Sequence, residues 1–99
     1  MLTINAVIRA RKGEEDALRR ALLEVADNVR ANEPDTIGFF ISQDLEDPSV
    51  FTTYERFTDR AAMDRHNGSA VVAKFFAIAR PLLDGAVTLV TASEISAKG

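Results

Sequence analysis

The chain has 99 residues, of which 46% are hydrophobic and 27% are charged, and this composition predicts one folded domain over residues 1–99 rather than a disordered chain. Twelve Lys and Arg residues against fifteen Asp and Glu residues give a net charge of -3, which argues against nucleic acid as a partner. Because the chain has no cysteine and a single histidine, we expect no disulfide, no thiolate nucleophile, and no metal site built from cysteines or from two histidines.

The beginning of the sequence shows no sign of a targeting segment. The stretch "MLTINAVIRARKG" lacks a basic leader followed by a sustained apolar run. No part of the chain approaches the ~18 consecutive apolar residues that a membrane span needs. These features predict a cytoplasmic protein with no membrane partner.

Two elements are predicted in the first third of the chain. Residues 2–10 alternate in polarity with a period of two, which is typical of a half-buried strand. From Glu14 onward, apolar residues recur at helical spacing and predict a long amphipathic helix that Pro34 ends. Acidic residues fill its first turn, where they complement the helix dipole. The apolar stripe consists of Leu18, Ala21, Leu22, Val25, Ala26 and Val29.

A hairpin is predicted next. Residues 36–45 and 50–57 are rich in β-branched and aromatic side chains, and the turn-forming segment "EDPS" joins them. Large apolar side chains fall on both faces of these two predicted strands. They are Ile37, Phe39, Phe40, Ile41, Val50, Phe51, Tyr54 and Phe57.

The second helical region is predicted to break in two. A short helix can begin after a cap at Thr58 or Asp59 and reach about His66, where a Gly-Ser pair follows. The serine of that pair, Ser69, can cap a second helix that runs to about Arg80. Two short helices are therefore expected in place of one long helix.

A final strand over residues 86–95 completes the predicted order, which is β-α-β-β-α-β. This is the order of an α+β, ferredoxin-like sandwich, in which helices cover one face of a four-stranded antiparallel sheet. Because the uncovered face would carry large apolar side chains, a second copy is expected to cover it and form a homodimer. The alternative is that strand twist and the chain ends cover this face within one chain.

His66 is the only side chain whose ordinary pKa lies near neutrality, so it is the natural candidate for a general acid or base. Ala62 and Met63 fall on the same side of the short helix, so the ring is expected to point toward the apolar interior. The alternative role is structural, because the dipole at a helix C-terminus favours a cationic histidine.

Aromatic side chains and one amide are candidates for ligand binding. Tyr54 can donate a hydrogen bond to a ligand oxygen. Asn5 stands among apolar neighbours, so its amide needs partners either in the fold or in a ligand. Four phenylalanines can line a pocket for a flat aromatic molecule or can serve as plain core. They are Phe39, Phe40, Phe75 and Phe76.

Glu55 and Asp59 lie in a stretch that also holds three arginines, Arg56, Arg60 and Arg65. This mixture of charges predicts a solvated, salt-bridged surface rather than a catalytic pair of carboxylates. The glycines have no spacing typical of a phosphate-binding loop, so no nucleotide or flavin cofactor is expected.

The segments "LTINAVIRARKGEEDAL" and "YERFTDRAAMDRHNGS" together resemble the antibiotic biosynthesis monooxygenase family. Members of this family typically show a strand that ends Tyr-Glu-x-Trp/Phe, a short helix with an Asp-x-x-Ala-x-x-x-His pattern, and a break before the next helix. The resemblance covers residues 2–95. It implies a dimeric α+β barrel with a pocket in each subunit between the sheet and the broken helix.

The resemblance also implies a chemistry. Pockets of this family bind quinone-like or polyketide aromatics, and some members oxygenate them with O2 and with no metal or flavin. By this resemblance His66 is the family histidine and would be catalytic, assisting deprotonation of the substrate. The substrate-binding candidates are Asn5, Phe39, Tyr54, Phe57 and Phe75, with Asn5 and Tyr54 holding substrate oxygens.

Two positions depart from the family pattern. Val71 stands where many relatives carry a second histidine, and Phe57 stands where haem-degrading relatives use a tryptophan. The leading hypothesis is a cofactor-independent monooxygenase that oxidises a quinol, phenolic or polyketide-like aromatic. The alternatives are an isomerase of small carbonyl compounds in the same pocket and a non-catalytic, ligand-binding dimeric module.

Overall fold

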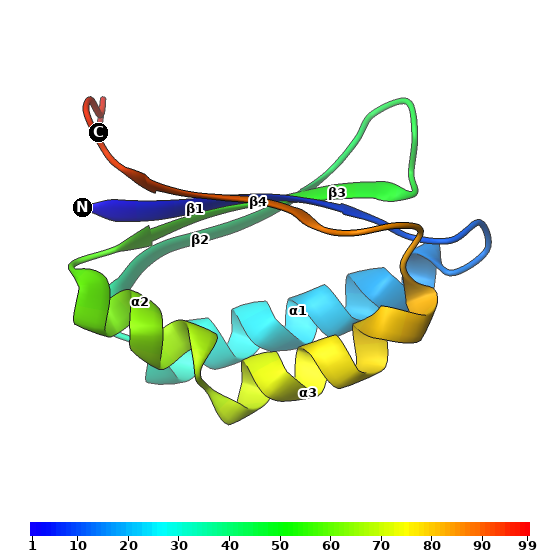
Figure 1. Cartoon of the computed structure of the whole chain (residues 1–99), viewed down its shortest axis with the longest axis horizontal. Coiled ribbons are helices and arrows are strands. Elements are labelled where there is room, and N and C mark those ends of the chain that lie inside the picture. The colour runs from blue at the N-terminus through cyan, green and yellow to red at the C-terminus, as the bar shows by residue number, and fades with distance from the viewer.

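The computed structural model describes residues 1–99 as a four-stranded antiparallel sheet with helices on one face (Figure 1). The strands are β1 (Leu2–Arg9), β2 (Thr36–Gln43), β3 (Val50–Phe57) and β4 (Thr88–Ser93). The helices are α1 (Glu15–Asn32), α2 (Arg60–Asn67) and α3 (Ala70–Ala79), and a short 3-10 helix (Arg80–Leu82) follows. This arrangement confirms the predicted ferredoxin-like α+β fold and its element order.

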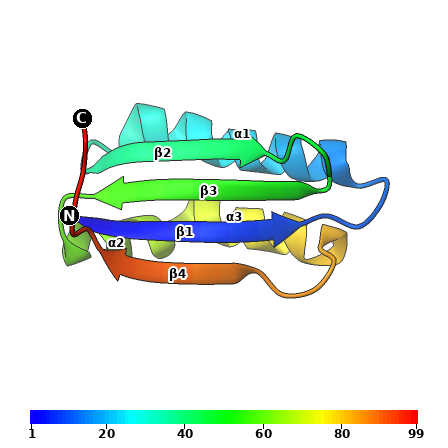
Figure 2. The same ribbon diagram turned by 90° about the horizontal axis from the view of Figure 1, so that it is seen from above.

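The strands lie in the order β2-β3-β1-β4, so β1 and β3 are central and β2 and β4 form the edges (Figure 2). The last strand is shorter than the predicted 86–95, because β4 pairs only with β1 and that register runs from Thr88 to Ser93. β2 likewise ends at Gln43, which pairs with Phe51. The hairpin of β2 and β3 has the predicted antiparallel pairing.

The core lies between the sheet and the helices in two separate clusters. The larger cluster joins the apolar stripe of α1 to β1, β3 and α3, and Leu18 and Phe51 are its most deeply buried large side chains. The smaller cluster contains Ile4, Phe57 and the α2 residues Ala62 and Met63. Burial of apolar area is the main stabilising contribution in such a layer. The two clusters leave a gap between them on the helix side of the sheet.

The other face of the sheet carries no helix (Figures 1 and 2). We call it the open face. Pairing aligns one residue from each strand in a row across this face, namely Phe40, Tyr54, Asn5 and Val90. Phe40 is 57% exposed and its ring stacks on that of Tyr54 at a centroid distance of 6.0 Å. Large apolar side chains therefore occupy both faces of the sheet, as predicted, although Phe51 and Phe57 point toward the helices.

The break between α2 and α3 is built from side-chain caps. Asp59 Oδ1 accepts a hydrogen bond from the Ala62 N–H at 2.8 Å, and Ser69 Oγ accepts one from the Val72 N–H at 3.3 Å. Ser69 Oγ also donates to the backbone oxygen of His66 at 2.8 Å. Both predicted caps are confirmed: Asp59 caps the start of α2, which ends one residue after His66, and Ser69 caps the start of α3. None of the helices has both the length and the apolar character needed to span a bilayer.

Loss of the Asp59 cap should destabilise the fold measurably. We expect Asp59→Ala to lower the free energy of unfolding by about 1 kcal/mol, because the Ala62 N–H loses its acceptor. Urea unfolding monitored by circular dichroism measures this change. The matched control is Thr58→Ala, an exposed neighbour whose side chain makes no cap. Equal destabilisation by the two variants would show that the cap contributes nothing specific.

Candidate functional site

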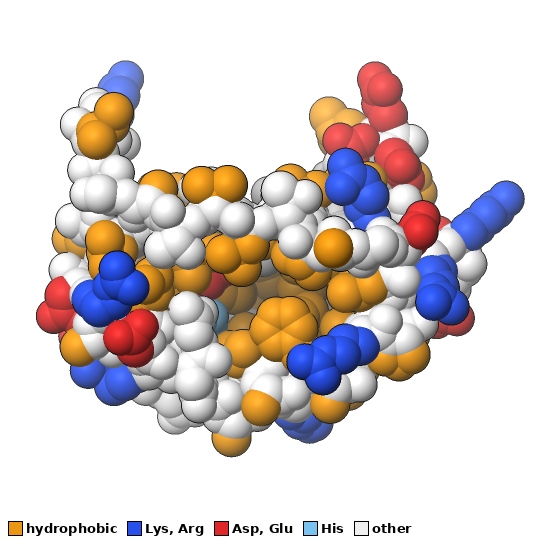
Figure 3. Space-filling model, in the orientation of Figure 1, with side chains coloured by type: hydrophobic (Ala, Val, Ile, Leu, Met, Phe, Trp, Pro, Cys, Tyr) orange, Lys and Arg blue, Asp and Glu red, His pale blue; other side chains and the backbone are white.

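A pocket of about 230 Å³ lies in the gap between the sheet and α3. Side chains of α1, of α3 and of the helix-facing side of the sheet form its walls. Its mouth appears in Figure 3 as a hollow ringed by hydrophobic side chains. Eleven of the fifteen lining residues are hydrophobic, and the four others are Thr53, Glu55, His66 and Asn67. The apolar lining residues are Ile4, Ala6, Ile8, Leu22, Val25, Phe39, Val72, Phe75, Phe76, Val87 and Leu89.

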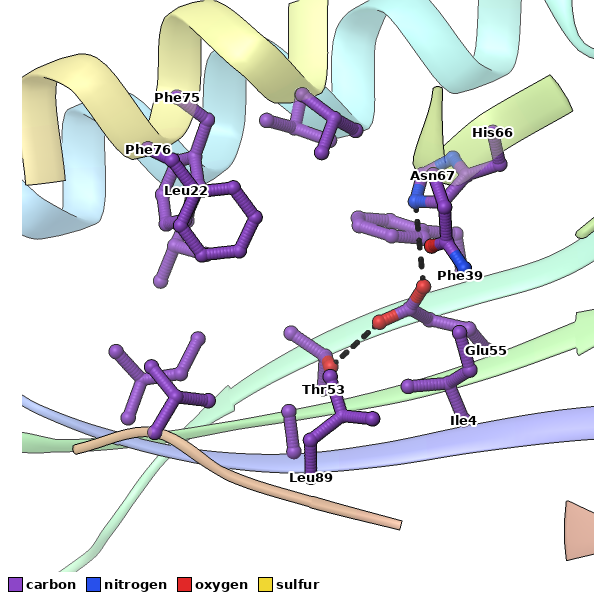
Figure 4. A pocket seen from close by; sticks show the side chains of 15 residues that line it. Ile4, Leu22, Phe39, Thr53, Glu55, His66, Asn67, Phe75, Phe76 and Leu89 are labelled. Atoms are coloured by element: carbon purple, nitrogen blue, oxygen red, sulfur yellow. Dashed lines mark hydrogen bonds and ion pairs between the residues drawn. The ribbon is translucent and has the colours of Figure 1, made fainter. Parts of the chain in front are cut away.

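The polar residues gather at the α2 end of the pocket (Figure 4). His66 Nε2 lies 3.3 Å from Glu55 Oε1, and the Thr53 hydroxyl donates to Glu55 Oε2 at 2.7 Å. On the side away from the pocket, His66 Nδ1 lies 2.8 Å from Glu33 Oε1. Each nitrogen of the imidazole therefore faces a carboxylate, one inside the pocket and one outside it.

Three elements bring these groups together. Glu55 shares the helix-facing side of β3 with Phe51, Thr53 and Phe57, because side chains alternate along a strand. His66 sits in the last turn of α2. Glu33 is the first residue after α1. The site thus depends on how the end of α1, the middle of β3 and the end of α2 are packed.

The imidazole is enclosed. His66 is 5% exposed and Glu55 is 7% exposed. The rings of Phe39 and Phe57 lie against the imidazole at centroid distances of 5.5 and 5.4 Å. Every buried side-chain nitrogen and oxygen has a hydrogen-bond partner. The ring is consequently held in one orientation, with its edges on carboxylates and its faces on aromatic side chains.

The pKa of His66 reflects two opposing effects. Burial lowers the pKa, whereas the hydrogen bonds and the negative charges of Glu55 and Glu33 raise it. The carboxylates outweigh burial, so the pKa lies above its ordinary value of about 6.5. A larger fraction of His66 is therefore cationic at neutral pH than of a free histidine.

The structure brings together only part of the predicted site. His66, Phe39 and Phe75 line the pocket, and Phe57 is fully buried beside the His66 ring without lining the pocket. Asn5 and Tyr54 pair with each other on the open face. Neither side chain lines this pocket, because strand alternation turns both to the opposite side of the sheet from His66.

Two functional candidates escaped sequence reasoning. Glu55 was expected at a solvated surface with Asp59, and this is wrong for Glu55, which is buried, while Asp59 caps α2. The signal for Glu55 was present, since the period of two places it on the same face as Phe51 and Phe57. Glu33 carried no local signal, because it lies 33 residues from His66 along the chain.

The structure has no group of three or more His, Cys, Asp or Glu side chains arranged to hold a metal ion. The polar end of the pocket is instead suited to proton transfer. A buried imidazole hydrogen-bonded to a carboxylate can hold or release a proton next to a bound ligand.

Residues 1–78 match the family model described as antibiotic biosynthesis monooxygenase. A solved structure from Mycobacterium tuberculosis is 20% identical with a TM-score of 0.90, and the alignment covers 99% of this chain and 98% of that chain. A protein from Pseudomonas aeruginosa is 27% identical with a TM-score of 0.86 and coverage of 96% and 94%. A Nitrosomonas europaea protein provisionally described as an antibiotic biosynthesis monooxygenase is 18% identical with a TM-score of 0.88 and coverage of 97% and 100%. No curated protein matches the sequence.

The contribution of His66 to stability should depend on pH. Because its pKa is raised in the fold, this contribution is fully present below about pH 6.5 and is lost as the pH rises through the folded-state pKa. We expect the difference in unfolding free energy between the wild type and His66→Asn to shrink as the pH rises from about 6 through the folded-state pKa. Urea unfolding at several pH values measures it, and NMR titration of this single histidine gives its pKa directly. A pKa at or below about 6.5, or a difference that grows with pH, would contradict the charge arrangement.

Proposed function

The chain belongs to the antibiotic biosynthesis monooxygenase family, and we propose that it oxygenates a small phenolic or quinol-type aromatic molecule in its pocket, without metal or flavin. The observation that carries this proposal is the His66–Glu55 pair at one end of an otherwise apolar pocket.

We further propose that residues 1–99 act as one domain of this family and work in the cytoplasm, where a chain without cysteines needs no oxidative folding.

The pocket supports a small, flat substrate. Its volume of about 230 Å³ is below the ~300 Å³ that is the low end for small-molecule sites, which favours a compact aromatic over haem or a large polyketide. Phe39, Phe75 and Phe76 provide aromatic walls. The only acceptors deep in the pocket lie at the His66–Glu55 end, so a substrate hydroxyl would be directed there.

The chemistry begins with removal of the hydroxyl proton. A phenolate gives an electron to O2 far more readily than the neutral phenol does, so a base beside an apolar site is what the reaction needs. For a simple phenol, one O2 gives a para-quinone and one water. One oxygen atom enters the ring, the other leaves as water with the two displaced hydrogens, and the substrate supplies all the electrons.

Glu55 and His66 would act as a pair in this step. The proton is shared between Glu55 Oε1 and His66 Nε2, which are 3.3 Å apart, and it is later returned to the reduced oxygen. The positive imidazole that forms lies beside the substrate anion and stabilises it. Because the pair must first be free of this proton, activity should rise with pH through the pKa of His66.

Removal of either member of the pair should abolish most of the activity. We expect His66→Ala and Glu55→Gln each to slow O2 consumption at least about tenfold with the best of a panel of hydroquinones and phenols. An oxygen electrode measures the rate. Glu46→Gln, in the exposed loop between β2 and β3, is the matched control and should leave the rate unchanged.

Two other outcomes of this experiment would replace the proposed monooxygenase with a different function. Turnover of a carbonyl compound without O2 uptake would replace the proposal with an isomerase. If no compound in the panel is transformed, although some raise the melting temperature, the protein is a ligand-binding module.

We propose that two copies form a homodimer through their open faces. Phe40, Tyr54 and Val90 are exposed apolar side chains in one row of that face, and Asn5 lies in the middle of the row. Tyr54 and Asn5 would then serve the interface rather than the substrate. Such a row supplies an apolar centre for association.

A charge placed in this row should weaken the dimer. We expect Phe40→Glu to raise the dimer dissociation constant at least about tenfold, because a carboxylate would have to be buried against apolar side chains. Sedimentation velocity over a concentration series measures it. Leu23→Glu is the matched control, since Leu23 is 46% exposed on α1, away from the open face. A wild-type protein that sediments as a monomer, or equal effects of both variants, would overturn the proposed interface.

A further inference from the structure

Glu33 is a carboxylate that touches the imidazole but does not line the substrate pocket. It belongs to a second hollow of about 250 Å³ on the other side of His66, which we call the outer pocket. The outer pocket has one hydrophobic residue among its nine. Its members are Asn28, Asn32, Glu33, Pro34, Asp35, Thr36, Ala62, Arg65 and Ser69. His66 lines the apolar pocket, and Glu33 connects its imidazole to the polar one.

We propose that Glu33 is a positioning residue that acts from the outer pocket: it holds His66 Nδ1 and thereby sets the pH at which the His66–Glu55 pair accepts the substrate's proton. This role rests on the proposed function of that pair. It assigns the two carboxylates different tasks, with Glu55 facing the substrate and Glu33 facing away from it.

The distances support this division. Glu33 Oε1 lies 2.8 Å from Nδ1, a shorter contact than the 3.3 Å from Nε2 to Glu55 Oε1. With Nδ1 bound on the outside, Nε2 is left to exchange a proton on the pocket side. Since the same ring nitrogen always faces Glu55, the imidazole needs no rotation to take up the proton and return it.

Glu33 is itself held in place. The Thr36 hydroxyl donates to Glu33 Oε1 at 2.8 Å, and the Asn28 amide donates to Glu33 Oε2 at 3.3 Å. Its side chain is only 16% exposed. Both donors are neutral groups that orient the carboxylate toward His66.

No other charge contacts the imidazole. The elements packed against it provide Glu33 from the end of α1, Glu55 from β3, and aromatic rings from β2 and β3. On α2 itself, Asp64 and Arg65 are exposed, and Arg65 pairs with Asp35 at the rim of the outer pocket. Glu33 is therefore the only group that can adjust the proton affinity of His66 without touching the substrate.

Glu33→Gln tests the proposal, because glutamine keeps a hydrogen-bond acceptor for Nδ1 and removes the charge. We expect this variant to lower the pKa of His66 by at least about one unit, a tenfold loss of proton affinity, in an NMR titration of the ligand-free protein. In the oxygen electrode, the pH profile of kcat/KM, which reports the free enzyme, should move to lower pH by the same amount. Glu33→Asp keeps the charge but withdraws it, and it should give an intermediate pKa.

Asp35→Asn is the matched control. It removes a carboxylate from the same outer pocket without touching His66. The proton affinity of His66 should therefore stay within about twofold of that in the wild type, and the pH profile should not move. The proposal is wrong if Glu33→Gln lowers the pKa of His66 by less than about one unit, or if Asp35→Asn lowers it as much as Glu33→Gln does. Because the titration needs no substrate, it decides the role of Glu33 even if no compound is oxygenated, and the absence of turnover would count against the proposed function alone.

Discussion

A buried imidazole with a carboxylate on each nitrogen is the interaction on which this structure depends. His66 is nearly inaccessible to water, and burial alone disfavours its charged form. The carboxylates of Glu33 and Glu55 reverse that preference. Breaking a buried ion pair by removing one partner typically costs about 3–5 kcal/mol, several times the contribution of an ordinary hydrogen bond. One imidazole ring thus connects three elements, namely the end of α1, the middle of β3 and the end of α2.

The pocket lies beside this arrangement. Side-chain caps confine α2 to eight residues, and α3 then packs against both α1 and the sheet in the larger core cluster. The space left over lies between the two core clusters and is apolar except at the end where the imidazole stands. In the proposed reaction, this apolar hollow would admit an aromatic ring and O2, and its one polar end would provide the base. Fold stability and the proposed chemistry therefore rest on the same residues.

Much of this could be predicted from local sequence. The elements, their order and the caps at Asp59 and Ser69 follow from periodicity and from capping chemistry, which act between neighbouring residues. The burial of His66 beside Met63 and Ala62 follows from helical spacing. One error arose where residue type was given more weight than alternation. Glu55 was expected at the surface, although the period of two places it on the helix-facing side of β3. The same period places Asn5 and Tyr54 on the open face, away from the pocket.

The sequence by itself determined the secondary structure, the break at His66 and which side chains share a face of each strand and helix, because these depend on contacts within about four residues along a helix or two along a strand. Only the tertiary structure decided that Glu33, Glu55 and His66 meet. Glu33 and His66 are 33 residues apart and belong to no common repeat, so nothing in the spacing of residues links them. Their meeting is set by how α1 and α2 pack on the sheet, which burial of apolar area drives. Pairing with the two carboxylates then offsets the cost of burying the imidazole.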